Sequence, residues 1–331
     1  MPKHGGRLRE AARASGIPLA DWLDLSTGIN PAAWPVPPLP PEVWQRLPEE
    51  NDGLEETAAA YYGNSRLLPL PGSQAAIWLL PRLFPPAAVA CLAPLYAEHP
   101  VAWEAAGHKV LRLPAGDLGA ALDTTAPCVL CVNPNNPTAH VLERDTVLEA
   151  AARLARRDGW LFVDEAFADA APECSVGDMA GSAAFPRLVV LRSLGKFFGL
   201  AGTRAGFLLG PADLLRTIRE KLGPWAVSHP ARYVAMLALS DRKWRDAARA
   251  RLDRESARLA GILAPLAEME PPAITALFVT LSLKTPCALF DALRKQGILT
   301  RPFADAGLLR FGLPGQEADW QRLSRALRLP D

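Results

Sequence analysis

The sequence predicts an α/β fold: a large domain with a mostly parallel central sheet, followed by a smaller α+β domain. From residue 71 onward, short apolar segments alternate with helical ones. The short segments are apolar on both faces, which is typical of parallel strands covered by helices on both sides. After His229 the pattern changes to one long charged helix followed by short strands and helices. That change indicates a second, smaller unit.

The elements of the large domain are expected in a regular alternation. Helices are expected at residues 73–84, 97–106 and 143–157, the last of them stopped by Asp158-Gly159. Strands are expected at residues 88–92, 109–113, 128–132, 160–163, 188–191 and 207–209.

The small domain is expected to begin with a helix at 242–264 that stops before Pro265. The expected elements after it are a strand at 276–283, a helix at 287–295, strands at 298–301 and 308–312, and a helix at 317–327. Residues 30–44 are rich in proline, which excludes a helix or a central strand and favours an extended connector.

We therefore expect three parts. Residues 1–35 form an N-terminal arm that contributes to the small domain and the active site, residues 36–229 the large cofactor-binding domain, and residues 230–331 the small domain. With 331 residues, 50% of them hydrophobic, the chain is long enough for two cores.

Charge and composition exclude several classes of partner. The net charge is +1, with 36 basic and 35 acidic residues, so no basic surface for nucleic acid is expected. No apolar run is long enough to predict a membrane span, and the N-terminus lacks the apolar region of a secretory signal. The five cysteines, an odd number, indicate reduced thiols and a cytoplasmic protein.

Cys128 and Cys131 form a CxxC pair inside the apolar run PCVLCVN. In a strand, residues three apart point to opposite faces, and the chain has no second CxxC. We therefore expect two buried thiols in a strand, with no metal site and no redox pair.

The most informative stretch is the glycine-rich turn from Ser193 to Arg204, which contains Lys196. A lysine that forms an imine needs a desolvated amine near other cations, and a serine with an arginine suits a phosphate ester. An aldehyde that also carries a phosphate is pyridoxal 5′-phosphate. By itself the stretch is equally compatible with a surface turn and a solvated lysine.

Other polar groups fall where strands end, which is where open parallel sheets bind ligands. Gly72-Ser73-Gln74 opens a helix, so its N–H groups can hold a phosphate, although Ser73 can also be a plain N-cap. Two prolines stiffen the turn at residues 133–138. Asp164 follows three apolar residues, as either a helix N-cap or the partner of a buried cation.

Over nearly its whole length the chain resembles pyridoxal-phosphate enzymes of the aspartate-aminotransferase fold (fold type I, class I/II aminotransferase family). Within that family it is most similar to the threonine-phosphate decarboxylases, which are related to the histidinol-phosphate aminotransferases. The motifs that carry the resemblance are HGG (4–6), STGINP (26–31), GSQ (72–74), NPNNPT (133–138), VDEAF (163–167) and SLGKFFGLAGTR (193–204).

The resemblance implies a role for each cofactor residue. Lys196 forms the imine with the cofactor and moves protons, and Asp164 pairs with the pyridine nitrogen. Asn136 donates to the ring oxygen. Tyr96, which by itself could be an ordinary half-buried tyrosine, stacks on the ring. The residues implied to hold the cofactor phosphate are Gly72, Ser73, Gln74, Ser193 and Arg204.

A phosphorylated amino acid needs cationic groups at both of its ends. The candidate substrate residues are His4, Asn30, Arg301 and Arg310. His4 is expected to reach the substrate phosphate, although a terminal residue can also be mobile. The glycine pair after it favours a close backbone approach to a ligand. Arg310, together with Arg301, is expected to hold the carboxylate.

The chain departs from the family pattern at two positions. Phe167 stands where many relatives have a tyrosine that donates to the ring oxygen, which leaves Asn136 as the main donor. Leu47 stands where relatives often have a tyrosine that reaches the phosphate of the neighbouring subunit. The resemblance still implies a homodimer.

Three functions remain open from the sequence. The first is decarboxylation of L-threonine O-3-phosphate to (R)-1-aminopropan-2-yl phosphate, a step of cobalamin biosynthesis. The second is an aminotransferase of the histidinol-phosphate type. The third is a non-catalytic binding protein of the same fold.

Overall fold

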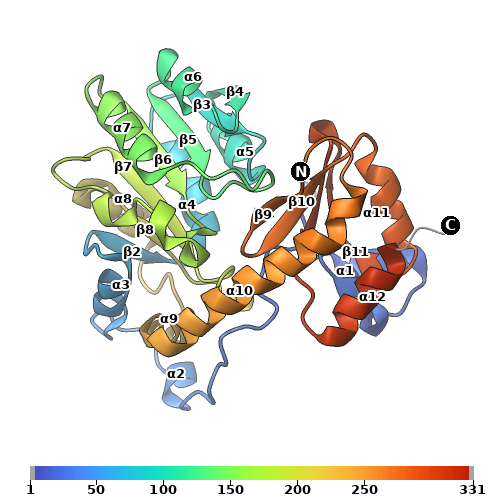
Figure 1. Cartoon of the computed structure of the whole chain (residues 1–331). Helices are drawn as coiled ribbons and strands as arrows, with labels where there is room; N and C mark the ends of the chain where they lie inside the picture. Colours follow the sequence, from blue (N-terminus) through green and yellow to red (C-terminus); the bar gives the residue numbers. More distant parts are fainter. Residues whose placement is uncertain (1–3, 328–331) are drawn as a thin grey trace. The chain divides into compact units, whose positions relative to one another are not determined.

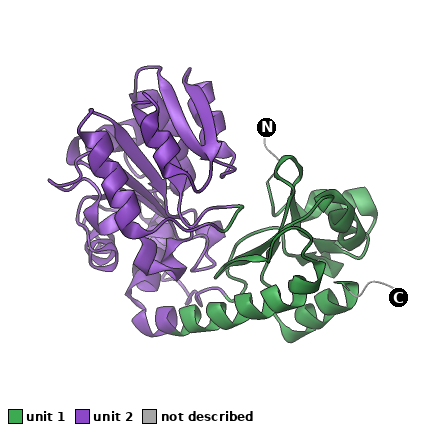
Figure 2. Ribbon diagram, turned by 45° about the horizontal axis from the view of Figure 1, so that its top comes forward, with its two compact units in different colours: residues 1–32, 137–139, 247–331 green, residues 33–136, 140–246 purple. Residues whose placement is uncertain are grey.

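The computed structural model describes residues 4–327, which fall into two compact units (Figure 2). Unit 1 comprises residues 1–32, 137–139 and 247–331, and unit 2 comprises residues 33–136 and 140–246. The first boundary lies close to the expected end of the N-terminal arm. The second lies at residue 246, inside the long helix, and not at the expected residue 229.

Unit 2 is built on a seven-stranded sheet with the order β2-β8-β7-β6-β5-β3-β4 (Figure 1). β8 is antiparallel to both of its neighbours, and all other adjacent pairs are parallel. This confirms the mostly parallel sheet. The strands are β2 (Leu67–Leu70), β3 (Ala88–Ala93), β4 (Lys109–Pro114), β5 (Cys128–Val132), β6 (Trp160–Asp164), β7 (Leu188–Ser193) and β8 (Gly206–Leu209).

Helices cover both faces of this sheet. On one face, alternate strand residues such as Leu130 and Phe162 form a core with α4, α5 and α8. The residues between them, such as Val129 and Leu161, are also fully buried. Since nearly every position of the central strands is buried, these strands read as continuous apolar runs. The helices are α2 (Glu42–Gln45), α3 (Leu54–Tyr62), α4 (Ser73–Leu79), α5 (Glu98–Ala105), α6 (Leu118–Asp123), α7 (Arg144–Ala155), α8 (Ala212–Leu222) and α9 (His229–Ser240).

The proline-rich connector contains no helix or strand in its first part, but α2 begins at Glu42. The prediction that residues 30–44 contain no helix is therefore wrong for residues 42–44, which belong to α2. Pro40 and Pro41 precede the helix, where a missing N–H costs nothing because the first turn has no intrahelical acceptor for it.

The two cysteines of the CxxC pair lie in β5, whose bounds are as expected. Cys128 belongs to the core on one face and Cys131 does not, so the two thiols point to opposite faces. All five cysteines are free thiols. Within residues 4–327, no group of three or more metal-ligating side chains is placed to hold a metal ion.

Only Cys287 should react quickly with a thiol reagent in the native protein, because the other four cysteines are buried. Burial raises the pKa of Cys91, Cys128 and Cys174 to about 12. Since the thiolate is the reactive form, only roughly 10⁻⁴ of each is reactive at pH 8. Titration with 5,5′-dithiobis(2-nitrobenzoate) should show one fast thiol, and five after denaturation. Two or more fast thiols in the native protein would contradict this burial.

Unit 1 contains a four-stranded antiparallel sheet, β12-β13-β10-β9, and a parallel pair, β1-β11. Its strands are β1 (Leu23–Asp24), β9 (Ala273–Thr275), β10 (Phe278–Ser282), β11 (Ile298–Leu299), β12 (Arg301–Phe303) and β13 (Leu308–Gly312). Its helices are α1 (Leu8–Ser15), α11 (Pro286–Arg294), α12 (Glu317–Leu327) and most of α10 (Arg242–Leu263).

The single strand expected at 298–301 is two short strands. β11 pairs with β1, whereas β12 pairs with β13, so the chain changes partner at Thr300. Sequence periodicity does not reveal this break, because only Thr300 separates the two strands. None of the helices in the described range has the length and apolar composition needed to span a membrane.

Candidate active site

The residues predicted to hold the cofactor lie at one edge of the sheet of unit 2. Parallel strands end at the same edge, and β8 runs in the opposite direction, so the turn before β8 also lies there. These residues are Ser73 after β2, Tyr96 after β3, Asn136 after β5, Asp164 at the end of β6, Lys196 after β7 and Arg204 before β8.

Asp164 is buried and paired with a histidine. Its Oδ2 lies 2.8 Å from His99 Nε2, with side-chain exposures of 4% and 3%. Its Oδ1 accepts a hydrogen bond from the N–H of Ala166. Two roles were expected for this carboxylate, a helix N-cap or the partner of a buried cation. Its contact with His99 makes it a buried group with a basic partner. His99 was not expected from the sequence, although it lies three residues after Tyr96, at the start of α5.

Tyr96 connects this pair to the start of α4. Its ring meets the His99 ring edge-on, with centroids 6.1 Å apart. Its hydroxyl donates to Gln74 Oε1 at 3.1 Å, while the Gln74 amide donates to Glu98 Oε2 at 2.9 Å. The Gln74 side chain is thus committed to protein partners, which leaves its backbone N–H for a phosphate. Burial raises the pKa of Tyr96 to about 12, so its hydroxyl stays a donor at neutral pH.

Arg204 lies directly over the glycine that precedes α4. A Cβ atom on Gly72 would lie 2.7 Å from Arg204 Nη2, so a larger residue would displace the guanidinium. Gly72, with φ of 80°, is the N-cap and Ser73 is the first helical residue. The expected alternative, in which Ser73 is the cap, is therefore wrong. A guanidinium beside the free N–H groups of a helix start is suited to a phosphate.

Lys196 lies in the turn after β7 and is half-buried. Its Nζ lies 5.5 Å from the centre of the ring of Phe167, which is itself 4% exposed. In the same turn, Ser193 Oγ accepts a hydrogen bond from the N–H of Gly195. Phe167 therefore packs beside the lysine as an apolar wall, at the position where many relatives are expected to have a tyrosine.

The turn at residues 133–138 is tied to the same edge. The N–H of Asn133 donates to the carbonyl of Asp164 at 2.9 Å. The Asn133 amide exchanges two hydrogen bonds with the backbone of Leu142, so Asn133 has a structural role. Asn136, with 9% exposure, follows at the tip and stays the predicted donor to the ring oxygen.

These residues are linked through unit 2, between Arg204 and Lys196, by contacts and by closeness along the chain. Arg204 lies over Gly72, and contacts join Gln74 to Tyr96, Tyr96 to His99, His99 to Asp164, and Phe167 to Lys196. Gly72 and Gln74, and likewise Asp164 and Phe167, are near neighbours in sequence. The set contains an amine, a buried carboxylate, an aromatic ring and a guanidinium over a helix start. These groups are the ones that pyridoxal 5′-phosphate requires.

A buried ion cluster lies behind the lysine turn and was not expected from the sequence. Arg192 of β7 is 3% exposed and donates to Glu165 Oε2 and Asp169 Oδ1, each at 2.5 Å. Burial alone would lower the pKa of Arg192, but Asp169 and Glu165 raise it well above its usual value. Since Glu165 directly follows Asp164, the cluster fixes the ends of β6 and β7 to each other.

In unit 1, His4 and Arg301 line one cavity of about 500 Å³. The glycine pair after His4 has a structural cause. A Cβ on Gly5 would lie 2.3 Å from the carbonyl oxygen of Ser26, and the N–H of Gly6 donates to Ser26 Oγ at 2.7 Å. Contact with Ser26 thus requires the glycine at position 5, whereas a φ of 77° favours the one at position 6. Gly5 also lines the cavity, so the expected ligand contact stays a prediction.

Arg310 is 6% exposed and lies opposite Arg301 in the register of β12 and β13. Its Nη2 donates to the carbonyl of Ser26 at 2.7 Å, and its guanidinium lies 5.1 Å from the Phe278 ring centre. Burial and the nearby charge of Arg301 lower the pKa of Arg310 to about 9. Two arginines so placed repel each other, and an anion beside them would relieve this repulsion.

Asn30 is buried, and its Oδ1 accepts hydrogen bonds from Arg251 and from the N–H of Ala32. It is not among the residues that line the cavity of His4 and Arg301. The structure thus brings two of the four predicted substrate residues to one cavity and places Arg310 beside Arg301.

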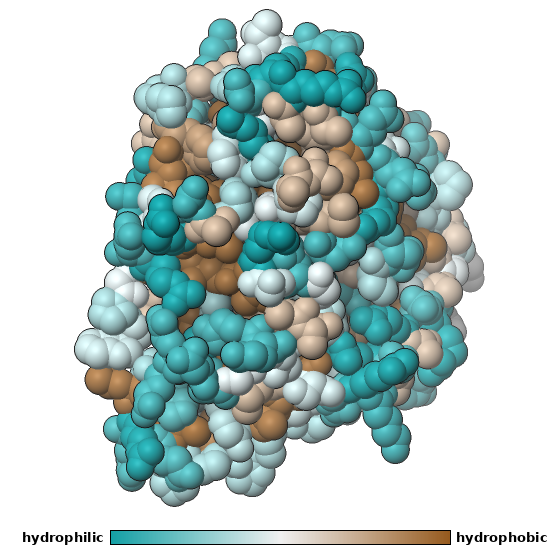
Figure 3. Space-filling view, turned by 90° about the vertical axis from the view of Figure 1, so that its left-hand side faces the viewer, coloured by the Kyte–Doolittle hydropathy of each residue, from teal (hydrophilic) through white to brown (hydrophobic). Residues whose placement is uncertain are grey.

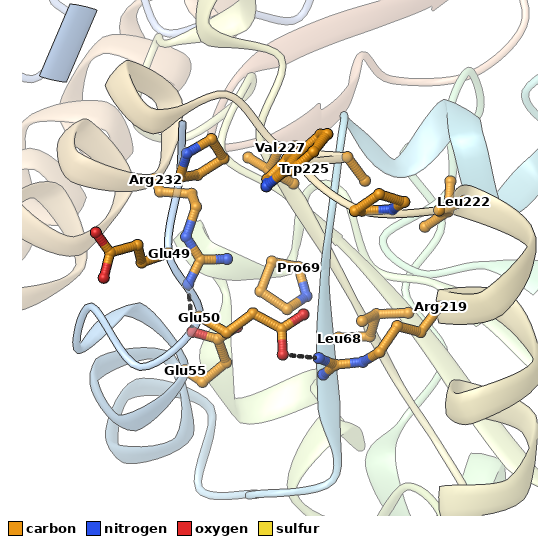
Figure 4. Close-up of a pocket in the computed structure, with 14 residues that line it drawn as sticks. Glu49, Glu50, Glu55, Leu68, Pro69, Arg219, Leu222, Trp225, Val227 and Arg232 are labelled. Carbon is orange, nitrogen blue, oxygen red and sulfur yellow. Dashed lines mark hydrogen bonds and ion pairs between the residues drawn. The ribbon is translucent and has the colours of Figure 1, made fainter. Parts of the chain in front are cut away.

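A second cavity, in unit 2, has a volume of about 420 Å³ and is lined by none of the predicted site residues (Figure 4). Both arginines that line it are paired with carboxylates. Arg219 bonds to Glu50 at 2.9 Å, and Arg232 bonds to Asp52 and Glu55. Because both cations are satisfied within the protein, the cavity has no unmatched positive charge for an anionic ligand.

Comparison with known proteins gives a consistent result. Residues 21–327 match the family model "Aminotransferase class I and II". The chain is 50% identical to a threonine-phosphate decarboxylase from Pseudomonas aeruginosa, over 99% of this chain and 97% of the relative. It is 41% identical to one from a Sinorhizobium species, over 98% and 97%.

Solved structures share the fold. A histidinol-phosphate aminotransferase from Sinorhizobium meliloti, in complex with pyridoxal-5′-phosphate, has a TM-score of 0.82 at 19% identity, covering 99% of this chain and 94% of its own. An L-threonine-O-3-phosphate decarboxylase from Porphyromonas gingivalis has a TM-score of 0.73 at 20% identity, covering 92% and 97%. The chain therefore belongs to the class I and II aminotransferase family and, within it, to the family of the threonine-phosphate decarboxylases.

Proposed function

We propose that this chain is a pyridoxal-phosphate-dependent lyase that converts L-threonine O-3-phosphate into (R)-1-aminopropan-2-yl phosphate and CO₂. The observation that carries the proposal is the gathering of Arg204, Tyr96, Asp164 and Lys196 at one edge of the sheet of unit 2, linked by the contacts described above. The reaction is supported by relatives named threonine-phosphate decarboxylase, which are 50% and 41% identical to this chain over almost its whole length. We infer from those names a step of cobalamin biosynthesis.

The residues of unit 2 would hold the cofactor. Arg204, Ser193 and the N–H groups after Gly72 would bind its phosphate, and Asn136 would donate to its ring oxygen. When bound, pyridoxal phosphate supplies an electron sink for the electrons of the broken bond.

The catalytic residues have distinct tasks. Asp164, held in place by His99, would pair with the pyridine nitrogen of the cofactor. Tyr96 would offer its ring as a stacking surface. Lys196 would hold the cofactor through its amine and supply a proton to the substrate carbon.

The residues of unit 1 would bind the two anionic ends of the substrate. We assign the carboxylate to Arg310, whose buried guanidinium can form a two-pronged contact with it. We assign the phosphate to the cavity of His4 and Arg301. This changes the expected role of Arg301, because the cavity that it lines also contains the residue expected to hold the phosphate.

An aminotransferase is the second candidate, favoured by the family model and by a Shewanella oneidensis histidinol-phosphate aminotransferase that is 35% identical over 59% of this chain. We expect the purified holoenzyme to release CO₂ from L-threonine O-3-phosphate without a 2-oxo acid. A strict requirement for 2-oxoglutarate, with glutamate formed and no CO₂, would overturn the lyase in favour of the aminotransferase.

We also propose a cytoplasmic homodimer. Figure 3 shows apolar groups gathered between polar ones on one face of the molecule. Three large apolar side chains of unit 2 are strongly exposed, Trp44 at 68%, Leu47 at 59% and Trp225 at 59%. Such exposed side chains support a subunit contact. The free thiols support a reducing compartment.

A further inference from the structure

We propose that Arg7 and Thr300 complete the phosphate site of unit 1 and select for substrates that carry a dianionic phosphate. This inference deepens the proposed function and rests on it for the identity of the phosphate ester. Both residues line the cavity of His4 and Arg301.

The charges around this cavity leave one cation unmatched. Its charged or titratable lining residues are His4, Arg7, Glu10, Cys287, Asp291, Arg294 and Arg301. Glu10 pairs with Arg7 at 3.1 Å, and Asp291 pairs with Arg294 at 3.4 Å. Among the described residues, no carboxylate lies within ion-pair distance of Arg301. The cavity is therefore suited to an anion.

Thr300 supplies an independent sign of a ligand. It lies at the break between β11 and β12, is 1% exposed, and its Oγ1 has no hydrogen-bond partner. Thr280 is similarly buried, but its hydroxyl donates to the carbonyl of Pro137 at 2.7 Å. Buried hydroxyls without a hydrogen-bond partner are rare because no new hydrogen bond compensates for the loss of hydration. A phosphate oxygen in the cavity would accept from Thr300.

Arg7 supplies the second positive charge. Its ion pair with Glu10 is exposed, at 48% and 67%, so it contributes little and can be exchanged for a phosphate. Arg7 and Arg301 line the same cavity. Burial and the charge of Arg7 lower the pKa of Arg301. Two arginines match the two charges of a phosphate monoester, whereas a carboxylate needs only one.

The first test compares matched variants of the holoenzyme. Arg7→Ala should raise KM for L-threonine O-3-phosphate about tenfold, with kcat within about twofold, because a charge-assisted contact to the bound group is lost. Arg9→Ala removes an exposed arginine of the same helix that does not line the cavity, and should leave KM unchanged. Equal KM values for both variants and the wild type would overturn the role of Arg7.

Thr300→Val separates a ligand contact from a structural role. We expect KM to rise about threefold or more while the melting temperature stays the same or rises, because no internal hydrogen bond is lost. Thr280→Val, its matched control, should lower the melting temperature because the carbonyl of Pro137 loses its donor. If Thr300→Val lowers the melting temperature as much as Thr280→Val does and leaves KM unchanged, Thr300 has a structural role and the proposal fails for this residue.

A binding readout keeps the inference separate from the reaction. Cys287 is an exposed thiol that lines the same cavity. Inorganic phosphate should slow its modification by 5,5′-dithiobis(2-nitrobenzoate) in the wild type and in Arg9→Ala, and much less in Arg7→Ala. This pattern would support the site even if no CO₂ were released. The absence of protection in the wild type, or equal protection in Arg7→Ala, would overturn it.

Discussion

Lys196→Ala should abolish decarboxylation and the visible absorption of the bound cofactor together. The amine at this position is proposed both to bind the aldehyde and to move a proton, and no other lysine lies in the motif that carries the resemblance. A lost proton-transfer group alone costs about 10² to 10⁴ in rate, so we expect the rate to fall by at least about 10³-fold. Steady-state CO₂ release and an absorption spectrum measure both effects.

Two controls make this result specific. Lys196→Arg keeps the positive charge over Phe167 but cannot form the imine, so it should be equally inactive. Lys221→Ala removes an exposed lysine of α8 and should change nothing. Substantial activity in Lys196→Arg would mean that charge alone is required, which contradicts the assigned role.

Arg192→Met should lower the free energy of unfolding by about 3 to 5 kcal/mol. The substitution keeps an apolar stem but leaves Glu165 and Asp169 buried without their cation, and an uncompensated buried charge costs about that much. Arg187→Met is the matched control, since the Arg187–Asp158 pair lies at the surface, with exposures of 33% and 87%. That variant should lose at most about 1 kcal/mol in urea unfolding.

The loss in Arg192→Met should also depend on pH. Burial already raises the pKa of Glu165, although Arg192 and other hydrogen-bond donors oppose this rise. Without Arg192 the pKa rises further, so the folded state binds a proton more tightly than the unfolded state does. The contribution of Glu165 to stability is then highest at low pH. It is lost as the pH rises through the pKa of Glu165 in the folded protein. The loss of unfolding free energy in Arg192→Met should therefore be smaller at pH 5 than at pH 8. A larger loss at pH 5 would contradict the role assigned to the buried ion cluster.

The strands of unit 2 could be predicted because they are buried on both faces. Their apolar runs have clear ends, and the catalytic groups follow those ends, so Asp164 and Lys196 were placed correctly at one edge of the sheet. β2 was not expected, because its sequence LLPL contains a proline and lies before the first clear helix. The change of partner at Thr300 depends on β1, which pairs with β11 and is remote from it in sequence.

The contacts between side chains could not be predicted from single motifs. His99 and Arg192 each sit in apolar surroundings, where a histidine or an arginine has no periodicity to reveal it. Their partners, Asp164, Glu165 and Asp169, lie at least 23 residues away along the chain. Likewise, a glycine is required at position 5 because its backbone lies against Ser26, which is not a neighbour in sequence.

The fate of the Cα hydrogen tests the central claim most directly. L-Threonine O-3-phosphate carrying deuterium at Cα should be incubated with the holoenzyme, and the amine product analysed by mass spectrometry. If the bond to the carboxylate breaks, as proposed, the product retains the deuterium and one CO₂ is released for each amine formed. Loss of the deuterium to solvent, with a 2-oxo acid as product and no CO₂, would contradict the decarboxylase.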